Sequence, residues 1–93
     1  MLRSFKDKDT EAIWRRRNVK AMGPELVKAV YKKLAILDAA GNINDLRVPP
    51  GNRLEKLRGD REGQHSIRVN DQYRICFVWK HDGAEDVELT DYH

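Results

Sequence analysis

The sequence predicts a two-layer α+β fold in which two N-terminal helices pack on an antiparallel sheet. Apolar residues recur at helical spacing between residues 24 and 40, whereas the apolar period changes to two beyond residue 64. The helical pattern comes first and the strand pattern follows without a linker or an internal repeat. We therefore expect residues 1–93 to form a single domain.

The first elements expected are a short strand at residues 2–5 and a helix within residues 7–20. Asp7 or Asp9 can cap this helix, because a short carboxylate side chain accepts a hydrogen bond from the first turn. Three arginines at positions 15–17 are expected near its C-terminal end, where the helix dipole favours positive charge.

A longer helix is expected to begin at Pro24, since proline is tolerated in the first turn. One face of this helix is apolar and is expected to pack on the sheet. It contains Leu26, Val27, Val30, Leu34 and Leu37. Gly41 follows as the expected C-terminal cap, which gives a helix of roughly 17 residues and about 25 Å.

Residues 42–53 are expected to form a loop, because Pro49-Pro50-Gly51 disfavours both a helix and a strand there. Further along the chain, Asp82-Gly83 marks a turn within residues 81–85. The strand that returns from this turn is expected at residues 86–93, where it completes an antiparallel meander.

The chain from residue 64 to residue 80 is expected to form a hairpin whose second strand is central in the sheet. A loop of odd length, at residues 70–72, keeps the alternating apolar side chains of both strands on one face. The same register places Arg68 beside Arg74 on the other face. Adjacent like charges destabilise a sheet slightly, so water, an acidic neighbour or a bound anion such as phosphate should offset the repulsion.

The charges are distributed unevenly along a chain whose formal net charge is +3. Residues 1–33 carry ten basic and four acidic side chains, and residues 47–80 carry eight and four. The tail from residue 81 carries five acidic side chains and no lysine or arginine. A basic body suits a polyanionic partner, although an ordinary solvated surface explains the same distribution equally well.

A basic segment leads into the hairpin and contains Gly59 and Gly63, which permit tight turns. Beside an arginine-bearing sheet face it can form the wall of a phosphate-binding groove, although many surface turns have this composition. The candidates for RNA binding here and on the first hairpin strand are Arg53, Lys56, Arg58, Arg61 and Arg68.

Several other classes of site are not indicated. The lone Cys76 excludes an internal disulfide and indicates a reducing compartment, and no histidine has metal-ligand spacing with it. Phosphate-loop, dinucleotide and nucleophile-elbow motifs are absent, so we expect no metal and no cofactor. No apolar run has the length of a signal peptide or a membrane span, and we expect a cytoplasmic protein.

The sequence ends in three groups that can exchange protons or hydrogen-bond a phosphate, namely Asp91, Tyr92 and His93. A terminal histidine is most often inert, but an unperturbed imidazole titrates near neutral pH and can transfer a proton. Acid–base chemistry beside Arg74 and simple binding are therefore both open on the residues alone.

The stretch LRGDREGQHSIRVNDQYRICFVW, residues 57–79, and the ending DYH resemble the HigB family of bacterial toxins within the RelE-like superfamily. The resemblance covers nearly the whole chain, from MLRSF at its start to the terminal triplet. It implies a compact fold like that of microbial ribonucleases, with two helices on a curved antiparallel sheet.

The resemblance also implies an activity and its partners. Members of the family are type II toxins that enter the A site of the 70S ribosome, cut the mRNA there and inhibit translation. The ribose 2′-hydroxyl attacks the adjacent phosphate, and no metal ion is needed. A helix-turn-helix antitoxin of the HigA type neutralises these toxins, and operator DNA is bound only through the toxin–antitoxin complex.

Carried over by position, the resemblance implies four catalytic residues. Arg74 matches the arginine that holds the scissile phosphate and stabilises its developing charge. His93 is the best candidate for proton transfer, and Asp91 can orient His93 or act as the base itself. Tyr92 can stack on a base or hydrogen-bond the phosphate.

Two positions depart from the family pattern. Some relatives have a histidine where this chain has Glu55, and a lysine where it has Arg58. Glu55 can still accept a proton but repels phosphate when ionised, so we expect activity that is weaker or shifted in codon preference. Glu55 also supports the alternative that the chain is a catalytically weakened RNA-binding or ribosome-binding module, or an operon corepressor. A small DNA-binding protein is disfavoured, because no basic recognition helix is evident.

Overall fold

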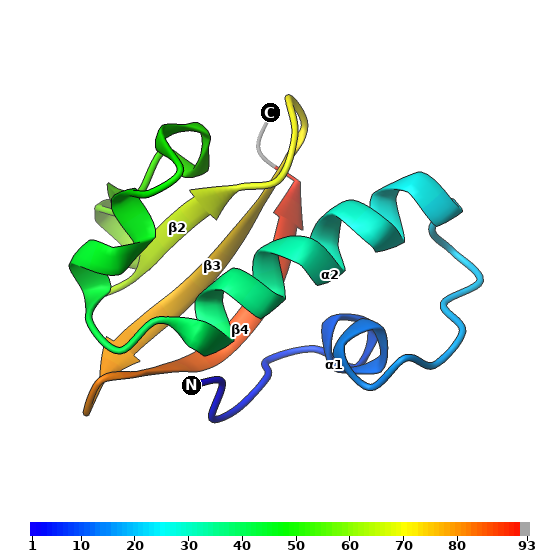
Figure 1. Ribbon diagram of the computed structural model, residues 1–93, viewed down its shortest axis with the longest axis horizontal. Helices are drawn as coiled ribbons and strands as arrows, with labels where there is room; N and C mark the ends of the chain where they lie inside the picture. Colours follow the sequence, from blue (N-terminus) through cyan, green and yellow to red (C-terminus); the bar gives the residue numbers. More distant parts are fainter. Residues whose placement is uncertain (92–93) are drawn as a thin grey trace.

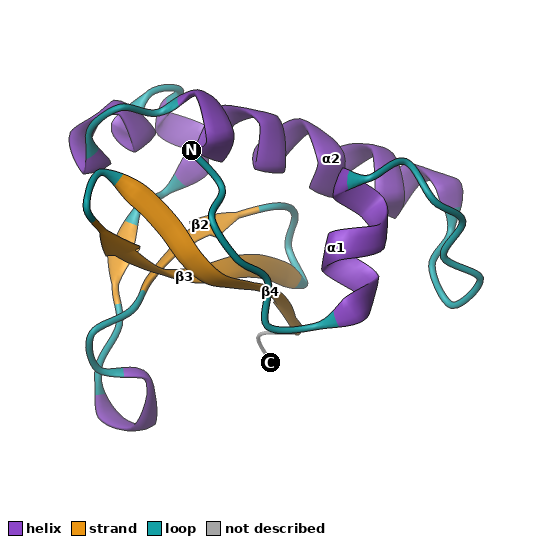
Figure 2. Ribbon diagram, turned by 90° about the horizontal axis from the view of Figure 1, so that it is seen from below, coloured by secondary structure: helices purple, strands orange, loops and turns teal. Residues whose placement is uncertain are grey.

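The computed structural model describes residues 1–91 and has two layers (Figure 1). Helices α1 (Lys8–Trp14) and α2 (Pro24–Ala39) lie on one side of the sheet, as Figure 2 shows. The strands are β1 (Glu55–Lys56), β2 (His65–Arg68), β3 (Tyr73–Lys80) and β4 (Gly83–Asp91). Neighbours in the order β1-β2-β3-β4 are antiparallel, which confirms the predicted α+β fold and the interior position of β3.

The N-terminal segment runs beside β4, although it is not a regular strand of the sheet. Leu2 and Phe5 form isolated parallel bridges with Ala84 and Val87. The N–H of Leu2 also donates to the Asp38 carboxylate at 2.9 Å, which ties the start of the chain to the end of α2. The strand predicted at residues 2–5 is therefore replaced by two bridges at the edge of the sheet.

Helix α1 is capped by Asp7, whose carboxylate accepts the N–H of Thr10 at 3.0 Å. Of the two candidates, Asp7 is thus the cap, and Asp9 lies in the first turn. The three arginines lie near the end of this helix as predicted, but just beyond it, because α1 ends at Trp14, Arg15 is its C-cap and its last turn has no basic residue. Arg16 has a φ of 61°, and this left-handed conformation stops the helix.

Helix α2 begins at Pro24 as predicted, but its end differs from the prediction. Ala40 is the C-terminal cap and has an extended backbone, with φ −70° and ψ 128°. Gly41 instead donates its N–H to the carboxylate of Asp45 at 3.0 Å. The chain therefore leaves the helix toward a new capped element and does not need a left-handed glycine. No helix within residues 1–91 has the length and apolar character needed to cross a membrane.

The segment predicted as a loop contains two short 3-10 helices, and a third lies between β1 and β2. They are η1 (Ile43–Arg47), η2 (Pro50–Asn52) and η3 (Gly59–Arg61). A capping box between Asn42 and Asp45 stabilises the start of η1. This local hydrogen bonding gives order to a stretch in which proline and glycine predicted only an irregular path.

The hairpin has the predicted register, with Ile67 opposite Ile75 and Arg68 opposite Arg74. The next turn is tighter than predicted, because His81 and Asp82 take left-handed φ values of 53° and 57° and Lys80 pairs directly with Gly83. Strand β4 consequently begins at Gly83 and not at residue 86.

The core lies between the helices and the sheet. From α2 it takes Val30, Leu34 and Leu37, and from the sheet Ile67, Ile75, Phe77 and Val87. Leu26 and Val27, at the N-terminal end of α2, are only partly buried. This end of α2 extends past the sheet (Figure 1), so the predicted stripe is buried over its second half only.

Candidate active site

The face of the sheet opposite the helices, called the outer face below, carries most of the predicted site residues. Successive residues of a strand point to opposite faces, and Ile67, Ile75 and Phe77 lie in the core under the helices. Their neighbours therefore form two rows across the outer face. One row contains Glu55, Ser66, Cys76 and Glu88, and the other contains Arg68, Arg74 and Thr90.

Arg74 is held in place by three neighbours on this face. Its Nε donates to the Ser66 hydroxyl at 2.7 Å, and its Nη2 donates to the Arg53 carbonyl at 2.6 Å. The same Nη2 lies 3.6 Å from a carboxylate oxygen of Glu55. Only 12% of the Arg74 side chain is exposed, so the guanidinium group has one well-defined orientation.

The Arg53 carbonyl is positioned by a buried turn. Arg53 takes a left-handed φ of 46° at the end of η2, next to Asn52, which is fully buried. The Asn52 amide donates to the carbonyls of Leu46 and Val48 at 3.2 and 3.3 Å. Its oxygen accepts from the Lys33 ammonium of α2 at 2.6 Å. The hydrogen bonds of Asn52 and of the carbonyl of the adjacent Arg53 therefore link α2, the loop and Arg74.

Lys33 is itself affected by this arrangement. Burial lowers the pKa of Lys33 from its ordinary value, and the nearby charges of Lys32 and Arg68 lower it further. The ammonium group nevertheless donates to Asn52 from within the helical layer. Lys33 therefore supports the loop and is not available on the outer face.

The other predicted RNA-binding residues have different surroundings. Arg68 pairs with Asp71 in the hairpin loop, and Arg61 pairs with Glu88 at 2.6 Å on the outer face. Arg58 is exposed at the start of η3. Lys56 is opposite His65 in the register and so leaves the edge strand toward the helical side.

The C-terminal residues are predicted site residues of which the structure describes one. Asp91 ends β4 opposite Tyr73, one residue beyond the Thr90–Arg74 pair. Its carboxylate accepts from the Gln72 amide at 3.0 Å. Because side chains alternate, Asp91 leaves the strand on the side opposite to Arg74. Tyr92 and His93 lie outside the described residues.

Comparison with known proteins gives this site its context. The family model described as "RelE-like toxin of type II toxin-antitoxin system HigB" matches residues 3–93. The chain belongs to the HigB family. It is 46% identical to Toxin HigB-1 of Vibrio cholerae serotype O1, over 99% of this chain and 94% of that protein. It is 30% identical to Endoribonuclease HigB of Proteus vulgaris, and that match covers 100% of both chains.

A solved structure confirms the fold of this HigB-family chain. The chain is similar to a chain of the YoeB-YefM complex from Staphylococcus aureus, with a TM-score of 0.64 over 100% of this chain and 98% of that one. The sequence identity is 17%, so this similarity concerns the fold alone. The RelE-like fold expected from the sequence is thus confirmed.

Sequence reasoning missed Ser66, which is fully buried and whose hydroxyl accepts from Arg74. The hairpin pattern contained the signal, since Ser66 lies two residues before Arg68 and therefore on the same face as Arg74. His65, by contrast, stacks on Phe77 on the helical side, with ring centroids 6.2 Å apart. Among the described residues of this HigB-family chain, no group of three potential ligands could hold a metal ion.

Proposed function

We propose that this HigB-family toxin is a ribosome-dependent endoribonuclease that cuts mRNA in the A site and thereby inhibits translation. A HigA-type antitoxin neutralises it in the cytoplasm, and operator DNA is bound only through that complex. The relative from Proteus vulgaris, named an endoribonuclease, supports the activity because it is similar over its full length. The observation that carries the proposal is the fixed Arg74 guanidinium on the outer face, beside a carboxylate and further arginines.

The proposed reaction is attack of a ribose 2′-hydroxyl on the adjacent phosphate. Negative charge increases on the phosphoryl oxygens in the transition state, and a fixed cationic donor stabilises that charge. The Nε and Nη2 groups of Arg74 are used by Ser66 and Arg53. Among the described contacts, Nη1 makes no hydrogen bond, so we assign its two N–H groups to the phosphate.

Two proton transfers complete this reaction. The 2′-hydroxyl must lose a proton and the departing 5′-oxygen must gain one. We assign these transfers to His93 and Glu55, whose carboxylate is 59% exposed and 3.6 Å from Arg74. Asp91 is assigned the positioning of His93, and Tyr92 the stacking on a base. The reaction as proposed needs no metal ion.

The basic residues around Arg74 are assigned to the RNA backbone. Lysine and arginine side chains that neutralise phosphates release counterions and give affinity without sequence preference. Arg53 and Arg58 are exposed beside the outer face, and Arg68 lies next to Arg74 in the same row. Arg61, which pairs with Glu88 on the outer face, and Lys56, which leaves β1 toward the helical side, are assigned to the RNA backbone at the edge of the sheet.

The test uses purified 70S ribosomes that carry a defined mRNA and an empty A site. Cleavage is mapped by primer extension for the wild-type chain, Arg74→Ala and a truncation that lacks residues 91–93. We expect cuts at A-site codons for the wild type and a loss of about a hundredfold or more for Arg74→Ala. Arg47→Ala is the matched control, since Arg47 is exposed on η1.

A second candidate function is a binding module that docks on the ribosome or represses the operon without cutting RNA. The observation that favours this module is the contact of Glu55 with Arg74, because the carboxylate partly offsets the positive charge that would otherwise bind a phosphate. A wild-type chain that binds ribosomes but leaves the mRNA intact would make this module the better description.

A further inference from the structure

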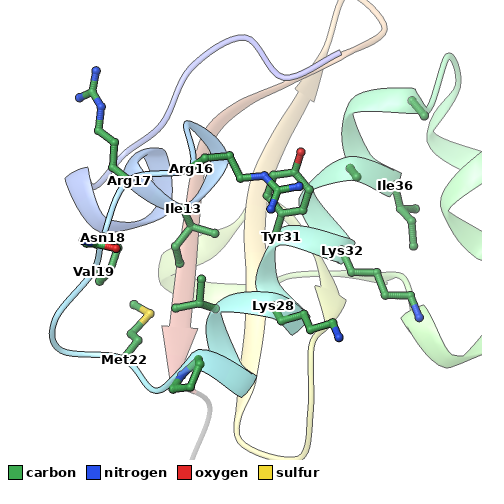
Figure 3. A pocket seen from close by; sticks show the side chains of 14 residues that line it. Ile13, Arg16, Arg17, Asn18, Val19, Met22, Lys28, Tyr31, Lys32 and Ile36 are labelled. Carbon is green, nitrogen blue, oxygen red and sulfur yellow. The ribbon is translucent and has the colours of Figure 1, made fainter.

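A groove of about 1010 Å³ lies on the helical layer, between α1, the segment at residues 15–23 and α2 (Figure 3). Its floor is apolar and consists of Ile13, Val19, Met22, Val27, Tyr31 and Ile36. Most of these side chains are only partly buried, although they pack against the core. The groove is therefore an unfilled extension of the hydrophobic layer.

Helix α2 has a second apolar stripe that faces this groove. Val27, Tyr31, Ala35 and Ala39 recur every four residues and all line the groove. They adjoin Val30, Leu34 and Leu37, which pack on the sheet, and turn progressively away from them toward Ala39. Twelve residues separate the ends of this stripe, which is about 18 Å at the rise of an α-helix.

The rim of the groove is positively charged. Arg16 and Arg17 come from the segment after α1, and Lys28 and Lys32 come from α2. None of the described residues that line the groove is acidic. Figure 3 shows Arg16 reaching to Tyr31, with its guanidinium carbon 3.8 Å from the ring centroid. An apolar floor between two cationic edges matches a ligand with an apolar face flanked by carboxylates.

We propose that this groove binds an amphipathic acidic helix of a partner protein. This inference rests on the proposed function, under which the partner is the antitoxin. The stripe along α2 suits a helix of about three turns, because ridges at four-residue spacing are inclined to the helix axis and pack into the grooves of a second helix. Glutamate or aspartate beside the apolar face of that helix would meet the four cations of the rim.

The lining favours a protein helix over RNA. Single-stranded RNA is held by basic grooves whose aromatic rings stack on bases, whereas this floor is mainly aliphatic. Tyr31 is the one aromatic ring among the described residues of the lining, and it already contacts Arg16 and stacks on Trp14 at 5.3 Å. A second copy of the chain related by a two-fold axis would bring the cationic rims together and is disfavoured by repulsion.

The groove and the candidate active site lie on different layers. The groove is on the helices, whereas Arg74 and Glu55 lie on the outer face of the sheet. A helix in the groove therefore does not contact the phosphate-binding arginine. Substitutions at the rim should change partner binding without removing a group that touches RNA.

The experiment compares three synthetic helices of about 12 residues that share one leucine face and differ only in their polar face. The polar face carries glutamate, glutamine or lysine. Binding to the full chain is followed by amide chemical shifts. We expect the glutamate helix to change the amide chemical shifts of Val19, Met22, Tyr31 and Ala35. Its affinity should be about tenfold above that of the glutamine helix. The lysine helix should bind most weakly.

Charge reversal of the rim supplies the decisive variant. Lys28→Glu/Lys32→Glu leaves Arg16 and Arg17 as the cations of the rim, so the three helices should then bind with nearly equal affinity, whereas Lys6→Glu/Lys80→Glu, which changes exposed residues outside the groove, should keep the order. Ala35→Trp fills the groove and should abolish binding of all three. These variants keep the packed core, which circular dichroism verifies.

Other outcomes overturn the proposal. Two of them are amide chemical shifts that no peptide changes, or that change only on the outer face. A third is an order of affinities that Lys28→Glu/Lys32→Glu leaves unchanged. The last two are tighter binding of a short single-stranded RNA at the groove and self-association of the chain through the groove. Ribosome-dependent cleavage is measured on the same variants and should be retained. A wild-type chain that does not cleave mRNA would refute the proposed function, while the order of the peptide affinities would still show whether the groove binds an acidic helix.

Discussion

At Arg74 a guanidinium group meets a hydroxyl, a backbone carbonyl and a carboxylate within 3.6 Å. The hydroxyl and the carbonyl fix the plane of the guanidinium group without offsetting its charge, whereas the negative charge of Glu55 partly offsets it. Arg68, opposite Arg74 in the register, is itself paired with Asp71. The repulsion expected between these two arginines is therefore reduced by acidic neighbours before any phosphate binds.

Arg74→Lys should reduce ribosome-dependent cleavage by about a hundredfold while the fold is retained. A lysine ammonium keeps the charge, but it cannot donate to Ser66 and Arg53 and also present a planar pair of donors to a phosphate. The measurement is the rate of cleavage at saturating ribosomes, with urea unfolding as a check of stability. Cleavage by Arg74→Lys at the wild-type rate would contradict the role assigned to the guanidinium.

Glu55→His should raise the cleavage rate roughly tenfold, because an imidazole near neutral pH transfers protons and does not repel phosphate. Glu55→Gln is the control that removes the charge without supplying a proton-transfer group. The comparison is made on ribosomes with a single defined A-site codon. No gain in Glu55→His would count against the view that Glu55 weakens this member of the family.

At the scale of the elements, short capped segments determine where the site residues lie. Asp7 starts α1, Asn42 and Asp45 start η1, and buried Asn52 holds the turn that presents the Arg53 carbonyl. Each of these side chains satisfies backbone groups that a helix end or a turn leaves unpaired. The positions of the elements therefore depend on a few polar side chains as well as on the core.

Asp7→Ala should lower the free energy of unfolding by about 1 kcal/mol, because the N–H of Thr10 loses its acceptor at the start of α1. Asp9→Ala is the matched control, since Asp9 is exposed in the first turn and is not the cap. Urea unfolding curves of both variants measure the difference. Equal losses in the two variants would contradict the assignment of the cap.

Asn52→Ala should cost about 1–3 kcal/mol, because the carbonyls of Leu46 and Val48 and the Lys33 ammonium lose their partner. It should also lower the cleavage rate of the folded variant, since the Arg53 carbonyl that orients Arg74 is no longer fixed. Asn44→Ala, at an exposed position of η1, is the control. Wild-type stability and wild-type cleavage in Asn52→Ala would show that this turn is not a support of the site.

At the scale of the whole molecule, the helical layer and the sheet offer two different surfaces. The outer face of the sheet presents arginines and carboxylates, whereas the helices present an apolar groove with a cationic rim. A hydrogen bond of 2.6 Å between Lys33 and Asn52 joins α2 to the turn whose Arg53 carbonyl contacts Arg74. A small domain can thus carry two separable surfaces, because its sheet is covered by helices on one face only.

Protonation of His65 should make the free energy of unfolding depend on pH. The Nδ1 atom of His65 is buried without a hydrogen-bond partner among the described residues. Burial lowers the pKa of His65 below its ordinary value of 6.5, and the charge of Lys56 lowers it further. Between the lowered pKa and 6.5 the unfolded chain binds more protons, so stability decreases as the pH falls through this window. Above 6.5 this contribution is constant.

Urea unfolding across this range measures the effect. His65→Gln should remove part of the loss of stability at acidic pH, whereas His81→Gln, at an exposed position in the β3–β4 turn, should leave it unchanged. Identical pH profiles for the wild type and His65→Gln would contradict the assignment.

The sequence by itself determined the two layers, the order of the elements and the hairpin register. Alternating apolar residues allow only one pairing that buries them all, and this pairing placed Arg68 beside Arg74. A cap at Asp7 or Asp9 and the start of α2 at Pro24 were likewise predictable, because caps depend on residues close in sequence, although only the structure selected Asp7. The resemblance to the HigB family also rested on residues that are contiguous in the chain.

Only the tertiary structure decided which groups surround Arg74 and where the helices end. The Arg53 carbonyl is 21 residues from Arg74, and Lys33 is 19 residues from Asn52. The left-handed Arg16 and the turn of Gly41 toward Asp45 ended the helices at positions that local propensity did not predict. The groove is formed by segments that meet only when α1 and α2 pack together. Periodic patterns specify which face of an element is buried, but contacts between distant segments follow from how the elements pack in space.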